Sequence, residues 1–161
     1  MIIRLSALAA VLAMAGLLVV ACASSSATHA VAARRLAAAK YLAIAQPANR
    51  RLNRDFDGGI NGPDRNNLVA AKADLRDAAA TERSFDRELM RIRLAPASEA
   101  AARVLFAVNQ SRARLTDQAA ASTSLAQLRA YESRLTAANV TVEDAVRLIR
   151  SELGLPPPAS S

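Results

Sequence analysis

The strongest pattern in the chain is a row of mostly apolar positions that recur at spacings of three and four residues. This spacing places the side chains on one face of a helix, and it predicts a helix over residues 63–94 that packs lengthwise against partners. The row consists of Leu68, Ala71, Leu75, Ala78, Glu82, Phe85, Leu89 and Ile92. Glu82 is the only charged residue in it, so we expect one carboxylate on the buried face.

A first helix is predicted over residues 28–56 by a similar apolar face. This face is formed by Tyr41, Ala45, Ala48, Leu52 and Phe56. Pro47 lies inside the stretch, and a proline removes a backbone donor and clashes with the preceding turn. We therefore expect a kink near residues 43–46, or two helices joined there. Three glycines and a proline then predict a loop over residues 57–64.

Three more helices are predicted after a turn at Ala95-Pro96. The first spans residues 97–121, with Ala101, Leu105, Val108, Arg112, Leu115 and Ala119 along its inner face. The second begins at Ser124, which forms a capping box with Gln127, and it presents Leu125, Leu128, Tyr131 and Leu135. A break at Asn139-Val140 and a second box of Thr141 with Asp144 predict a last helix that ends at Leu153, with Gly154 as its C-cap.

Composition supports an all-α fold. Lys40 and Lys72 are the only lysines among 21 basic residues, and the chain is rich in alanine, leucine and arginine but has no tryptophan. Such segments favour helices over strands. Because short loops make consecutive helices antiparallel, we expect an up-and-down bundle of four to five helices over residues 28–154. A disordered, proline-rich tail follows over residues 155–161.

The N-terminus has the pattern of an export signal. Arg4 supplies one positive charge, and residues 5–21 are apolar apart from Ser6. A charged start, an apolar middle and small residues at the exit are typical of a signal peptide over residues 1–21. The single cysteine, Cys22, follows directly, and a short tether is expected over residues 22–27.

The sequence Val19-Val20-Ala21-Cys22 resembles the lipobox of bacterial lipoproteins. This resemblance implies cleavage before Cys22, attachment of diacylglyceryl and palmitate chains there, and a lipid-anchored domain at the cell membrane, facing outside the cytoplasm. Two or more acyl chains anchor a protein stably. Two alternatives remain open from the residues alone: ordinary secretion with cleavage after Ala23, or an uncleaved transmembrane anchor.

The charge of the chain is concentrated next to this proposed anchor. Residues 23–54 contain no acidic residue and six basic ones, Arg34, Arg35, Lys40, Arg50, Arg51 and Arg54. The rest of the exported chain carries 14 basic and 14 acidic residues. We expect the basic segment to form a membrane-surface patch attracted to anionic headgroups, although a plain solvated face explains the same charges.

A buried polar layer is predicted between two of the helices. If the helices are antiparallel about Ala95-Pro96, Glu82 comes level with Asn109, and Arg112 lies one turn further. A buried charge has to be paired, so we expect Glu82, Asn109 and Arg112 to contact one another. We expect this layer to be a structural salt bridge that fixes the register of the helices; the alternative is a ligand or proton site.

Catalytic and metal sites find little support in the residues. His29 is the only histidine, so neither a catalytic triad nor a zinc or di-iron site can be assembled. The loop around Asp57 fails the EF-hand pattern, because Leu68 stands where a glutamate is required. Aromatic stacking platforms for nucleic acid are also missing.

We therefore expect no enzyme, no cofactor, no metal and no nucleic-acid partner. The expected protein is a lipid-anchored, extracytoplasmic bundle that serves as a non-catalytic binding, interaction or structural component of the cell envelope, possible partners being other envelope proteins. The alternative is a carrier of a small ligand or ion with a polar site around Glu82 and Arg112.

Overall fold

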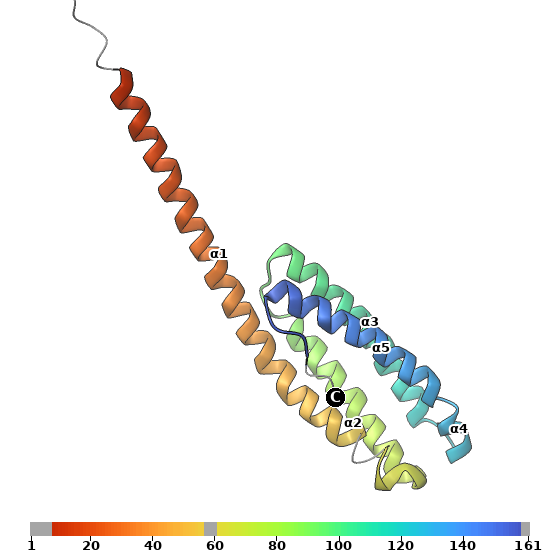
Figure 1. Cartoon of the computed structure of the whole chain (residues 1–161). Coiled ribbons are helices and arrows are strands. Elements are labelled where there is room, and N and C mark those ends of the chain that lie inside the picture. The colour runs from red at the N-terminus through yellow and green to blue at the C-terminus, as the bar shows by residue number, and fades with distance from the viewer. Residues whose placement is uncertain (1–7, 57–60, 159–161) are drawn as a thin grey trace, which may run out of the picture.

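The chain folds as an all-α bundle. The computed structural model describes the backbone of residues 8–56 and 61–158, and the side chains of these ranges from residue 27 onward. Its elements are α1 (Leu8–Asn53), the short 3-10 helix η2 (Pro63–Asn66), α2 (Leu68–Leu89), α3 (Pro96–Ala120), α4 (Leu125–Arg129) and α5 (Glu132–Leu153) (Figure 1). The described ranges contain no β-strand, and the predicted fold class is confirmed.

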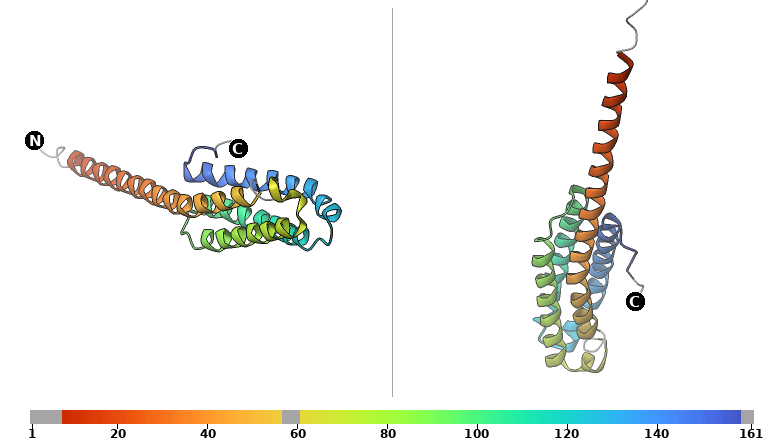
Figure 2. Two further views of the ribbon diagram at one scale, coloured as in Figure 1. Left: turned by 90° about the horizontal axis from the view of Figure 1, so that it is seen from below. Right: turned by 90° about the vertical axis from the view of Figure 1, so that its left-hand side faces the viewer.

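The four long helices run up and down. Helix α3 packs along α2 on one side and along α5 on the other, while α1 lies against α2 and α5 (Figures 1 and 2). The N-terminal half of α1 extends beyond the end of the bundle, so only its C-terminal part is packed against other helices (Figure 2). The short helix α4 closes the opposite end of the bundle, between α3 and α5.

The apolar core is divided into two clusters along the bundle. One cluster, at the end where α1 leaves the bundle, gathers buried side chains from α1, α2, α3 and α5: Tyr41, Leu89, Leu105, Ile149 and Leu153. The other, near α4, is built on Ala71, Leu75, Ala119, Ala120 and Leu128. The inner faces of α2 and α3 contribute to one cluster at one end and to the other cluster at the other end. Between the two clusters, near the middle of each helix, polar residues are buried instead.

Helix α1 runs through Pro47 without ending, so of the two alternatives predicted there, two separate helices is wrong. A proline cannot donate to the carbonyl four residues earlier, which here belongs to Ala43. Ala43 is exposed, and its carbonyl can be hydrated, so the missing hydrogen bond does not leave a buried acceptor unsatisfied. Residues 22–27, expected as a tether, also have helical backbone within α1.

Helix α2 begins later and ends earlier than predicted. Pro63 starts the separate η2, and Asn67 caps α2, its Oδ1 accepting from the backbone N–H groups of Val69 and Ala70 at 3.1 and 3.2 Å. An asparagine at this position satisfies donors that would otherwise be orphaned. Helix α2 stops at Leu89, five residues before the predicted end at Leu94.

The C-terminal part of the chain divides differently from the prediction. The Ser124 cap is confirmed, because its Oγ accepts from the Gln127 N–H at 3.2 Å, but α4 is only five residues long. Helix α5 then continues through Asn139-Val140, so the predicted break is wrong. The Thr141 hydroxyl donates to the Ala137 carbonyl inside α5 at 3.3 Å and caps nothing. Gly154 is confirmed as the C-cap, with a φ of 70°.

Candidate functional site: a buried polar layer between the core clusters

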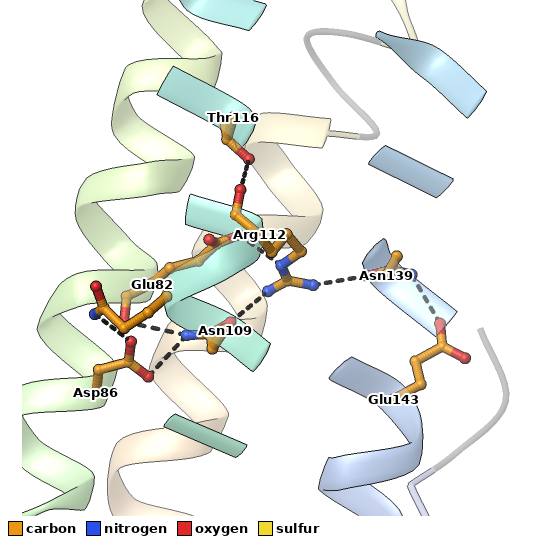
Figure 3. A network of polar contacts seen from close by, with 8 residues as sticks. Glu82, Asp86, Asn109, Arg112, Thr116, Asn139 and Glu143 are labelled. Atoms are coloured by element: carbon orange, nitrogen blue, oxygen red, sulfur yellow. Dashed lines mark hydrogen bonds and ion pairs between the residues drawn. The ribbon is translucent and has the colours of Figure 1, made fainter. Parts of the chain in front are cut away.

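The predicted polar residues meet in the middle of the bundle. Glu82 on α2 and Arg112 on α3 form an ion pair, with 2.8 Å between the arginine Nε and a glutamate oxygen (Figure 3). The Arg112 Nη2 donates to Asn109 Oδ1 at 3.1 Å. Antiparallel packing of α2 and α3 about the turn after Leu89 thus brings these three residues together as the sequence indicated.

The Glu82 carboxylate is fully shielded from solvent. Its side chain is 0% exposed, and that of Arg112 is 11% exposed. Its second oxygen has no hydrogen-bond donor among the described residues. Burial raises the pKa of Glu82 to about 7; Arg112 opposes this rise, and the nearby Asp86 adds to it. Desolvation therefore outweighs the ion pair, and Glu82 can take up a proton near neutral pH.

A second buried carboxylate, Asp86, joins the layer one turn further along α2. Asp86 is 0% exposed, and its two oxygens accept from Asn109 Nδ2 at 2.8 Å and from Gln110 Nε2 at 2.7 Å. Burial raises the pKa of Asp86, while the two amide hydrogen bonds and then Arg112 oppose the rise. The sequence analysis missed Asp86 and Gln110; the spacing of four residues between Glu82 and Asp86 was the available signal.

The layer continues to the surface through α5. The Arg112 Nη1 donates to Asn139 Oδ1 at 2.7 Å, and the Asn139 Nδ2 donates to Glu143 Oε1 at 2.8 Å (Figure 3). Asn139 is exposed, whereas Asn109 is buried. The chain of contacts thus links three helices, running from the buried interior to solvent. Asn139, which looked like a helix break in the sequence, supplies one of these contacts.

This arrangement binds its own polar groups to one another. The guanidinium of Arg112 contacts a glutamate and two asparagines, and the carboxylate of Asp86 accepts hydrogen bonds from two side-chain amides.

Two shallow surface depressions are lined by other residues. One, of about 310 Å³, lies between α3 and α5 and is lined by residues that include Arg114 and Arg134; the other, of about 410 Å³, lies at the α2–α3 turn.

The described part of the chain assembles no group of three or more His, Cys, Asp or Glu residues that could hold a metal ion. Residues 57–60, the middle of the loop tested against the calcium pattern, lie outside the described residues. His29 is exposed on α1, ahead of the bundle. The backbone of Cys22 is part of α1, and its side chain is outside the description.

The six residues of the predicted basic patch divide into two groups. Arg34 is exposed but contacts the end of α5, where its Nη2 donates to the Ser151 carbonyl at 2.9 Å and its guanidinium lies against Gly154. Arg35, Lys40, Arg50, Arg51 and Arg54 are exposed. Among these, Arg54 pairs with the buried Asp55 at 3.2 Å.

Fold and site together define an all-α bundle whose apolar core is interrupted by a buried ionic layer. Comparison with known protein families, with curated proteins and with solved structures finds no match for this chain. Within the ranges whose side chains are described, 27–56 and 61–158, no helix combines the length and the apolar character needed to cross a bilayer.

Proposed function

We propose that the chain is a lipoprotein, anchored through acyl chains on Cys22, whose helical bundle acts outside the cytoplasm as a non-catalytic binding, interaction or structural component of the cell envelope. The observation that carries this proposal is the sequence Val19-Val20-Ala21-Cys22 at the end of an apolar run. Its resemblance to a lipobox explains why the only thiol of the chain stands at this position.

The position of the bundle relative to Cys22 supports the proposal. Among the α1 side chains that the structure describes, which start at residue 27, burial begins at Ala37, and 15 residues separate this position from Cys22. At a helical rise of 1.5 Å per residue this distance is about 22 Å. Cleavage before Cys22 therefore removes nothing that the described core needs, and it leaves the bundle on a helical extension from the anchor.

The contacts of the polar layer favour a structural role over the carrier alternative. A carrier needs polar groups that are free to bind cargo. Glu82 and Arg112 pair with each other, and the two surface depressions are lined by other residues. The layer instead joins α2, α3 and α5 at one level, which suits a role in fixing how these helices are aligned.

Mass spectrometry of the protein purified from membranes tests the proposal. We expect a mature chain that begins at Cys22 and carries a diacylglyceryl group and an additional acyl chain, and a Cys22→Ala variant that is neither acylated nor cut at this site. A mature chain that begins at Ser24 would indicate ordinary secretion. An intact N-terminus would indicate a transmembrane anchor, and either result would overturn the proposal.

Co-purification then addresses which partner the bundle binds. The acylated protein is cross-linked in the membrane and then solubilised in mild detergent, and we expect envelope proteins to co-purify with it. A second sample receives excess free bundle before cross-linking, and these proteins should be absent from it. A protein that remains monomeric and without partners under these conditions would contradict an interaction role.

A further inference from the structure

We propose that the outward face of α1 lies flat on an anionic bilayer surface, so that the bundle rests on its side. We call this surface the basic face and define it by Arg35, Lys40, Arg50, Arg51 and Arg54, all exposed. The inference rests on the proposed function, because it takes Cys22 as the point where the chain is held at the membrane.

The packing of α1 divides the helix into two sides. The inner side carries the buried residues Ala37, Ala38, Tyr41 and Ala45. Residues on the opposite side are exposed. Ala39 and Ala43 among them are small, and the larger Leu36 is 59% exposed. Small side chains let a surface approach the backbone closely, while the long basic side chains around them reach its headgroups.

No other helix of the described ranges covers the basic face. When the molecule is viewed from the side of α1, this helix runs in front of the bundle, with the other helices behind and beside it (Figure 2). The extension of α1 beyond the bundle continues the same line (Figures 1 and 2). A plane laid along the outside of α1 therefore touches both the extension and the packed part of the helix.

The anchor position agrees with this orientation. Cys22 and Lys40 belong to the same continuous helix and are 18 residues apart. At 3.6 residues per turn this separation is five turns, so the two Cα positions lie along the same side of the helix. An anchor at Cys22 would hold that side toward the bilayer.

The sign of the charge distinguishes α1 from the other helices. Residues 23–54 include no acidic residue, whereas the rest of the exported chain has as many acidic as basic residues, and some of its exposed arginines pair with acids, as Arg103 does with Glu99 and Arg147 with Glu143. Asp55 partly neutralises Arg54, so the other four residues carry most of the attraction. Each basic side chain near an anionic membrane strengthens binding about fivefold.

The test uses the processed protein after its N-terminus has been established by mass spectrometry. It is reconstituted into vesicles of phosphatidylcholine alone or mixed with phosphatidylglycerol. An Ala43→Cys variant carries a fluorophore on the basic face, and an Ala107→Cys variant carries the same probe on an exposed position of α3. Since acylation occupies Cys22, the introduced thiol is the one free to react. Spin-labelled lipids report how close each probe lies to the bilayer.

We expect quenching of the probe at residue 43, only with phosphatidylglycerol and reversed by high salt, and little quenching at residue 107. The combined Lys40→Gln, Arg50→Gln and Arg51→Gln variant should shift the docked-to-free ratio about 100-fold toward the free state. The matched control, with Arg114→Gln, Arg129→Gln and Arg134→Gln, removes the same charge from α3, α4 and α5 and should change the ratio less than about twofold. Equal quenching at both positions, or quenching without anionic lipid, would overturn the inference.

The two proposals fail in different ways. A protein without acyl chains contradicts the lipoprotein assignment, and its sedimentation with anionic vesicles, compared between the two triple variants, still decides whether the basic face binds them. An acylated protein whose residue 43 stays unquenched contradicts only the flat orientation. In that case, binding of the tethered bundle to an acidic protein becomes the competing explanation of the basic face.

Discussion

Replacing Glu82 by glutamine should remove the pH dependence that this residue gives to the free energy of unfolding. In the folded protein burial raises the pKa of Glu82 from 4.5 to about 7. An acid with a raised pKa binds its proton more tightly in the folded state, so it favours folding most at low pH, and stability is lost as pH rises from about 4.5 through 7. Glutamine keeps the shape of the neutral side chain and cannot ionise.

The magnitude follows from the shift. A rise from 4.5 to about 7 corresponds to roughly 3 kcal/mol of unfolding free energy between pH 4.5 and 8. Because the Glu82 side chain is 0% exposed, solvent screening does not reduce this value much. We therefore expect the wild-type protein to lose roughly 3 kcal/mol relative to Glu82→Gln over this pH range.

Urea unfolding followed by circular dichroism at several pH values measures the difference between the two proteins. Glu88→Gln is the matched control, because Glu88 is exposed on the same helix and its substitution changes the net charge equally. The difference between Glu88→Gln and wild type should vary little with pH. If Glu82→Gln instead loses stability relative to wild type as pH rises, the ion pair with Arg112 outweighs burial, and the reasoning is wrong.

Three further predictions concern the polar layer, the apolar core and the C-cap of α5. Arg112→Met alone should destabilise the fold by about 3–5 kcal/mol at pH 8, because it leaves Glu82 buried without its partner. The double variant with Glu82→Leu should recover most of this loss in urea titrations; no recovery would contradict pairwise compensation. Tyr41→Ala should cost about 3–5 kcal/mol, since Tyr41 is 2% exposed and its ring meets Phe85 edge-on at 6.3 Å, whereas Tyr41→Phe should cost less than about 1 kcal/mol by thermal unfolding. A large loss with phenylalanine would show that the hydroxyl is required. Gly154→Ala should cost about 1 kcal/mol, because alanine is strained at a φ of 70° and its Cβ would lie 3.3 Å from the Arg34 guanidinium. An unchanged melting temperature would contradict that strain.

The periodicity of α2 and α3 was enough to predict both the fold class and the polar layer. Where a helix is amphipathic along its length, its buried face can be read from spacing alone, and Glu82 stood out because it interrupted that face. One turn between two such helices then fixes which residues face each other. The Glu82–Arg112 contact was therefore predictable because it depends on local pattern and a single loop.

The errors occurred where contacts between distant segments override local preference. Asn139 looked like a helix break, but it lies within α5 and is held by Arg112 of α3 and Glu143 of its own helix. Asp86 was missed, and its partner Gln110 lies on another helix. Arg34 was counted with the basic patch, although it contacts the end of α5, 117 residues later in the chain. The contacts of Arg112 with Asn139, of Gln110 with Asp86 and of Arg34 with Ser151 join different helices, so the spacing of neighbouring residues gives no signal for them.

The central claim is that the bundle is held at the membrane by acyl chains on Cys22, and metabolic labelling tests it most directly. Cells that express the wild-type protein or Cys22→Ser are grown with radioactive palmitate, and each protein is then isolated. We predict label in the wild-type protein and none in the variant. Equal labelling of both proteins, or none in either, would contradict the account.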